Sequence, residues 1–109
     1  MIKFKQLYDP KSSSYYTIDG KTMIFKVTSD EINKETRLKP HFAAILLELF
    51  SKHPAPVSYA IITSILQSNN FICSDETRLH RKVSELRLFL ANFYPALKQI
   101  ICNIRGVGY

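Results

Sequence analysis

The hydrophobic periodicity of this chain changes at Pro40. Before that residue, apolar side chains alternate with polar ones, as in "IKFKQLY" (2–8) and in the second half of "YYTIDGKTMIFKV" (15–27). Alternation with a period of two is typical of strands that have one buried face. After Pro40 the apolar residues recur at spacings of three and four, which is typical of helices with one buried face. The sequence therefore predicts an α+β fold, with an N-terminal antiparallel β-sheet over 1–38 followed by helices.

The N-terminal strands carry three further predictions. Ile2 and Phe4 share one face of the first strand, and the intervening lysines share the other. Asp19-Gly20 predicts a two-residue type I′ turn, because both positions of that turn take positive φ. The polar segment "TSDEINKE" (28–35) predicts a loop or an insertion.

Three helices are predicted between residues 39 and 93. Pro40 suits the first position of the first helix, which "KHPAP" (52–56) ends. Ser58 and Ser74 are suitable N-caps for the second and third helices. The expected buried stripes of the first two are Phe42, Ile45, Leu46, Leu49 and Phe50, then Ile61, Ile62, Ile65 and Leu66.

The third predicted helix, about 75–91, has two unlike faces. Its apolar line, spaced 4, 3 and 4, is Leu79, Val83, Leu86 and Leu90. At about 100° per residue the opposite side holds Thr77, Arg81, Ser84, Glu85 and Leu88, with Arg78 and Lys82 flanking the apolar line. One face is thus expected in the core, and a basic N-terminal half is expected to face outward.

The closing segment "QIICNIRGVGY" (99–109) predicts a strand, a tight turn and a return strand, so that 98–109 forms a hairpin. Gly106 and Gly108 allow a tight turn and close approach to another surface without a Cβ clash. Two short helices, a longer helix with a basic face and this hairpin together predict a winged helix-turn-helix, with the hairpin as the wing.

The charge is concentrated toward the C-terminus. The chain carries a net charge of +6. Residues 1–36 hold six lysines and five acids, whereas residues 77–109 hold six bases and a single acid, Glu85. This asymmetry is consistent either with a polyanionic partner such as nucleic acid or with a solvated surface.

Other function classes find little support in the sequence. At 109 residues the chain predicts a single domain over 1–109. The dense apolar segment "FAAILLELF" (42–50) is too short to span a bilayer, and the N-terminus shows no signal peptide, so a cytoplasmic protein is expected. Cys73 and Cys102, each after apolar residues, are expected to be reduced and core-lining. The absence of a glycine-rich phosphate loop, metal-ligand spacing or a triad predicts no enzyme, cofactor or metal site.

Several stretches of the chain resemble one family. These are "RLKPHFAAILLELFSKHPAPVSYAIITSIL" (37–66), "SDETRLHRKVSELRLFL" (74–90) and "NIRGVGY" (103–109). They resemble the winged-helix effector domain of OmpR/PhoB-type response regulators, and the "SELR" variant (84–87) looks more like the ToxR/CadC branch of one-component regulators. The resemblance implies a bacterial transcription regulator that binds double-stranded DNA, as a homodimer or in tandem. In that branch a membrane segment often follows the domain and tethers it to the inner membrane.

The resemblance also implies roles for individual residues. Thr77, Arg78, Arg81 and Lys82 match positions where the family's recognition helix meets bases and phosphates in the major groove. Arg105 matches the wing arginine that enters the minor groove, and Arg87 matches an arginine that contacts phosphate or locks the helix to the scaffold. Residues 67–74 match a loop that contacts RNA polymerase in some members, or form a plain connector.

Two residues depart from the family pattern. Lys39 replaces the Thr or Ser usually found before the helix proline, with the loss of a side-chain cap worth about 1 kcal/mol. Glu85 stands where many members carry an arginine, and its carboxylate would repel phosphate but could accept from cytosine N4. The expected function is sequence-specific duplex DNA binding. The alternative is a winged helix that binds an acidic protein partner.

Overall fold

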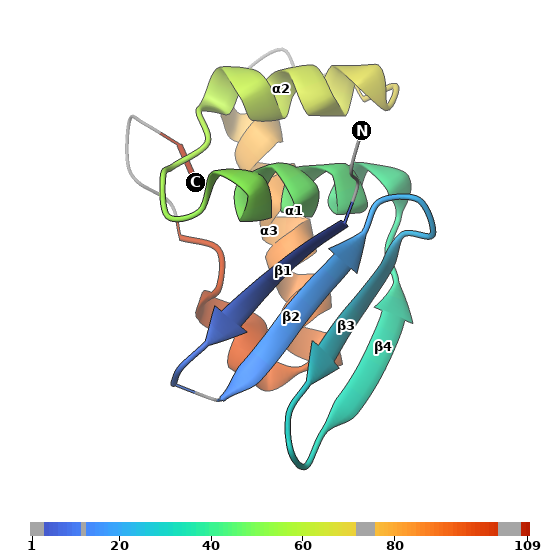
Figure 1. Ribbon diagram of the computed structural model, residues 1–109. Coiled ribbons are helices and arrows are strands. Elements are labelled where there is room, and N and C mark those ends of the chain that lie inside the picture. Colours follow the sequence, from blue (N-terminus) through green and yellow to red (C-terminus); the bar gives the residue numbers. More distant parts are fainter. Residues whose placement is uncertain (1–3, 12, 72–75, 103–107) are drawn as a thin grey trace. The chain divides into compact units, whose positions relative to one another are not determined.

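The computed structural model of the chain describes residues 4–11, 13–71, 76–102 and 108–109. They form two compact units, Met1–His53 and Pro54–Tyr109. The first unit holds four strands and a helix: β1 (Phe4–Asp9), β2 (Ser14–Asp19), β3 (Ile24–Thr28), β4 (Asn33–Arg37) and α1 (Pro40–Lys52). The second holds α2 (Tyr59–Ser68), α3 (Glu76–Phe93) and the 3₁₀ helix η1 (Pro95–Gln99) (Figure 1). The predicted α+β class, with strands first and helices after, is confirmed.

The four strands form one antiparallel sheet in the order β1-β2-β3-β4 (Figure 1). Because strand side chains alternate between faces, Tyr16 and Ile18 of β2 share a buried face with Phe25 and Val27 of β3. Helix α1 packs against β1 and β2. Its buried apolar residues are Phe42, Ala43, Ile45, Leu46 and Phe50, while the predicted Leu49 is partly exposed.

The apolar Phe4 lies on the exposed face of β1. Phe4 is 49% exposed, whereas Lys5 and Leu7 are partly buried. The register explains the difference, because Leu7 pairs with the buried Tyr16 while Phe4 pairs with Asp19 on the opposite face of the sheet. A shift of one residue exchanges the two faces of a strand, so the burial of its neighbours decides the orientation.

The turn between β2 and β3 is longer than predicted. Asp19 pairs with Ile24, which leaves a loop of residues 20–23 in which Met23 takes a φ of 62°. Asp19 remains in the strand, and its Oδ1 accepts from the backbone N–H groups of Lys21 (2.9 Å) and Thr22 (3.4 Å). The Lys21 N–H is the main reason that the pKa of Asp19 lies below its usual value.

The prediction of a loop or insertion over 28–35 is confirmed for residues 29–32 and is wrong for residues 33–35. Asn33–Arg37 forms β4, which pairs with β3 along its whole length. Four of its five side chains are exposed, and Lys26 of β3 forms an ion pair with Glu35 of β4 across the strands at 3.6 Å. A polar edge strand lacks the apolar alternation on which the sequence prediction relied.

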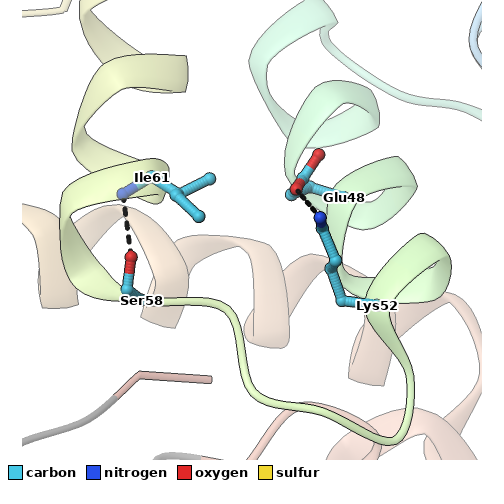
Figure 2. Close-up of polar contacts among 4 residues, drawn as sticks. All are labelled: Glu48, Lys52, Ser58 and Ile61. Carbon is cyan, nitrogen blue, oxygen red and sulfur yellow. Dashed lines mark hydrogen bonds and ion pairs between the residues drawn. The ribbon is translucent and has the colours of Figure 1, made fainter.

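The helix starts largely follow the sequence. Pro40 opens α1, and its N-cap Lys39 makes no side-chain cap bond, as predicted. In α2 the Ser58 Oγ accepts from the Ile61 N–H at 3.3 Å, so Ser58 is the predicted N-cap (Figure 2). Figure 2 also shows the Glu48–Lys52 ion pair within α1, at 3.9 Å. Ser74 lies outside the described residues.

The buried face of α2 is narrower than predicted. Ile62 and Leu66 are fully buried, whereas Ile65 is partly exposed and Ile61 is 40% exposed. At about 100° per residue, Ile61 lies about 100–140° and Ile65 about 60–100° around the helix from the two buried residues, so neither lies at the centre of the buried stripe.

The predicted C-terminal hairpin is not confirmed. Pro95 opens η1, which runs to Gln99, and residues 100–102 form no strand. Residues 103–107, which include most of the predicted turn, lie outside the described part. Gly108 forms an isolated antiparallel bridge with Ser58. Cys102 is exposed, so the expectation of a core-lining thiol is wrong there, and Cys73 is not among the described residues.

Candidate nucleic-acid interface

Helix α3 has the two unlike faces that its sequence predicts. Over its 18 residues, the side chains of the inward line are at most 1% exposed: Leu79, Val83, Leu86 and Leu90. The residues expected on the opposite side are all exposed: Thr77, Arg81, Ser84, Glu85 and Leu88. The helix contacts α2 and η1, which anchor it within the second unit. Because the inner side of α3 is buried, the same residues of its outer side are always exposed to a binding partner.

The predicted binding residues on α3 do not share one environment. Thr77, Arg78 and Arg81 are exposed near the start of the helix. Lys82 is only partly exposed, with 29% of its side chain accessible. The structure therefore leaves two arginines and a threonine accessible in the N-terminal half of α3, and it holds Lys82 closer to the protein.

Lys82 has two neighbours that hold its ammonium group. Its Nζ lies 4.4 Å from the centroid of the Phe71 ring and 3.4 Å from Glu85 Oε2. A cation over an aromatic face is attracted by about 0.5–1 kcal/mol at exposed sites. The Glu85 partner lies one turn away on α3 and could be predicted from the spacing, whereas Phe71 precedes the helix and nothing in the sequence signals its approach.

The side chain of Arg87 makes its contacts within the protein. Its Nε donates to the Ile101 carbonyl at 2.9 Å, and its guanidinium lies 5.3 Å from the centroid of the Tyr109 ring. Of the two roles that the resemblance implies, these contacts support the one in which Arg87 locks the helix to the scaffold. Arg87 therefore links α3 to the segment that follows η1 and to the end of the chain.

The end of the chain is held by backbone and aromatic contacts. Val57 and Tyr109 exchange two backbone hydrogen bonds, of 2.7 and 2.9 Å. The Tyr109 hydroxyl is hydrogen-bonded to His80 Nδ1, and the Tyr59 ring packs edge-on against both rings. Burial raises the pKa of Tyr109, although the nearby Arg87 charge acts in the opposite direction.

The sequence does not predict this aromatic cluster. In the sequence His80 is one of three histidines with no paired spacing, and Tyr59 and Tyr109 lie 50 residues apart. The cluster arises because the bridge between Ser58 and Gly108 brings the chain end beside the start of α2, while His80 projects from α3. Arg105, the predicted wing residue, lies outside the described residues.

The described residues contain neither a cluster of side chains that could hold a metal ion nor a helix that could cross a membrane. Among residues 4–11, 13–71, 76–102 and 108–109, no three His, Cys, Asp or Glu side chains are grouped so that they could hold a metal ion. No helix in this part of the chain is long and apolar enough to cross a membrane.

One shallow pocket lies in the first unit, beside the β2–β3 loop and β4. It has a volume of about 560 Å³ and is lined by Lys21, Thr22, Ile24, Glu35, Thr36 and Arg37. Its charges are mixed, and Glu35 is paired with Lys26. The pocket therefore has no single charge that would select a ligand, in contrast to the N-terminal half of α3.

Comparisons of this chain with protein-family models, curated proteins and solved structures found no match.

Proposed function

We propose that this chain binds double-stranded DNA in a sequence-dependent manner, as the DNA-binding domain of a bacterial transcription regulator. The observation that carries the proposal is the pair of exposed arginines, Arg78 and Arg81, on a helix whose opposite face is fully buried. The major groove is about 12 Å wide and admits one α-helix. A helix fixed to its domain by one face and basic on the other is suited to that groove.

In this proposal the exposed residues of α3 make different kinds of contact with DNA. Arg81 lies on the side opposite the buried line, where its guanidinium can pair with the O6 and N7 of guanine. Arg78 lies nearer the buried line of α3, where its guanidinium can contact a phosphate, and the exposed Thr77 hydroxyl can contact another. Lys82 adds positive charge close to the protein surface. In the same proposal Arg105 enters the minor groove as part of a wing.

Arg87 has a different part in this proposal. Because the Arg87 Nε donates a hydrogen bond to the Ile101 carbonyl oxygen, Arg87 holds α3 to the segment after η1 and does not contact DNA in this proposal. Its contribution to binding is therefore indirect, through the placement of the helix.

A salt titration of duplex binding tests the proposal. A protein that neutralises phosphates releases counterions, and the logarithm of its affinity falls with the logarithm of salt concentration by about 0.9 for each phosphate contact. We expect a steep fall for a 20–30 base-pair duplex, measured by fluorescence anisotropy. Failure to bind, or an affinity that does not change with salt, would contradict the proposal.

One observation favours a second function, the binding of an acidic protein partner. Leu88 is 63% exposed on the same side of α3 as Arg81. An exposed leucine beside basic residues is suited to a protein surface that combines apolar and acidic side chains. A Leu88→Ala variant distinguishes the two functions: if α3 binds DNA mainly through charge, this variant should keep its affinity for DNA within about threefold, whereas a protein partner should be lost.

A further inference from the structure

Glu85 is an unexpected residue on a surface that is proposed to bind DNA. It is the single acid among residues 77–109 of the sequence, and 47% of its side chain is exposed. It follows Arg81 by four residues, so the two side chains lie on the same side of α3, about 6 Å apart along the axis. That separation is close to two base-pair steps of duplex DNA, at about 3.4 Å each.

A carboxylate in this position weakens binding to most DNA. It is repelled by the phosphates on both sides of the groove and by the acceptor atoms of most bases. Guanine presents only acceptors to the major groove, and thymine presents an acceptor and a methyl group. Adenine presents a donor, but its N7 acceptor lies next to that donor. Cytosine N4 donates a hydrogen bond without an adjacent acceptor on the same base, and it is therefore the partner that suits a carboxylate best.

The contacts of Glu85 reduce the penalty of carrying this charge. Lys82 Nζ lies 3.4 Å from Glu85 Oε2 and is itself held over the Phe71 ring at 4.4 Å. The ammonium thus partly offsets the charge of the carboxylate where the two approach DNA. Such an exposed pair adds little to the stability of the fold.

We infer that Glu85 is a specificity-determining residue, which accepts a hydrogen bond from cytosine N4 and penalises the other bases at one position of the DNA site. This inference rests on the proposed function. The ligand that it describes is a duplex containing a cytosine at the Glu85 position, with a guanine contacted by Arg81 about two base-pair steps away on either strand. The Glu85 carboxylate is repelled by DNA sites that present a hydrogen-bond acceptor at its position, and it therefore weakens binding to those sites. The arginines supply most of the affinity.

The test compares base preference with and without the charge. The wild-type protein is first used to select its preferred sites from a random duplex library. Affinity is then measured for the selected duplex and for all base substitutions at each position. Glu85→Gln preserves the shape of the side chain and removes its charge, and Ser84→Ala is the control at a neighbouring exposed position.

We expect the wild-type protein to prefer cytosine at one position by about tenfold, which lies within the range for one well-placed base contact. In Glu85→Gln this preference should fall below threefold at that position alone, and binding to unrelated duplex should become tighter. Ser84→Ala should keep the wild-type pattern. Circular dichroism verifies that both variants are folded.

Two results would overturn the inference while leaving the proposed function intact. One is a wild-type protein that binds duplex DNA but selects no cytosine at any position that Glu85→Gln affects. The other is a Glu85→Gln variant whose affinity changes by the same factor for every sequence, which would reduce Glu85 to a general charge effect. A wild-type protein that binds no duplex at all would contradict the proposed function itself.

Discussion

Replacement of Gly108 by alanine should strongly destabilise the second unit. A Cβ on this residue would lie 1.9 Å from the Val57 carbonyl oxygen and 3.0 Å from the Ser58 Cα. Both are backbone atoms, which cannot move aside as a flexible side chain can. The clash would therefore separate the chain end from the segment before α2.

The size of the effect follows from the contacts that would be lost. Val57 and Tyr109 exchange two backbone hydrogen bonds, each worth about 1 kcal/mol. The Tyr109 side chain, now 8% exposed, would lose part of its burial, at a cost of about 1–2 kcal/mol. We expect Gly108→Ala to lower the free energy of unfolding by about 3 kcal/mol in all, a large share of the 5–15 kcal/mol typical of small domains.

Urea denaturation followed by circular dichroism measures this change. With an m-value of about 1–2 kcal/mol/M, the midpoint should fall by about 2 M. Tyr109→Phe is the matched comparison, because it keeps the backbone bonds and the ring but loses the hydroxyl bond to His80, and it should cost only about 1 kcal/mol. A midpoint for Gly108→Ala within about 0.5 M of the wild type, at an unchanged m-value, would refute the reasoning.

Three further predictions concern the packing and charges of the described residues. Leu86→Ala should cost about 3 kcal/mol in urea denaturation because Leu86 is fully buried, whereas the exposed Leu88→Ala should change stability by less than about 0.5 kcal/mol. Arg87→Lys keeps the charge but not the Nε bond to the Ile101 carbonyl, so it should lower stability by about 1–2 kcal/mol and leave the salt dependence of DNA binding unchanged. The folded-state pKa of Asp19 is lowered, so its stabilising contribution is present above the unfolded value near 3.8 and is lost as the pH falls through the folded value. Unfolding of Asp19→Asn, measured from pH 6 to pH 2.5, should therefore depend less on pH than unfolding of the wild type.

The features that the sequence predicts well are those set by the periodicity of one segment. The four buried residues of α3 and the exposed residues opposite them follow from spacings of three and four alone. The Ser58 cap and the Pro40 helix start are equally local. Such features depend on neighbours along the chain, which are known before any tertiary contact is known.

The features that the sequence does not predict depend on partners far along the chain. The register of β1 with β2 determines which face of β1 is buried. The sequence of β4 is polar and shows no apolar alternation, although β4 pairs with β3. No regular spacing in the sequence predicts the contact between Lys82 and the Phe71 ring. The same is true of the contacts among Tyr59, His80 and Tyr109. The glycines near the chain end did predict a close approach to another surface, and Gly108 lies directly against the Val57 backbone.

The central claim is that the outer face of α3 binds DNA, and an arginine-for-arginine comparison tests it most directly. Arg81 on α3 and Arg37 on β4 are both exposed, so their alanine variants remove the same charge from different elements. The measurement is the affinity for one duplex over a series of salt concentrations. We expect Arg81→Ala, which removes a proposed base contact, to weaken binding at least tenfold at every salt concentration, with Arg37→Ala close to the wild type. Equal effects of the two variants, or an unchanged affinity in Arg81→Ala, would contradict the claim.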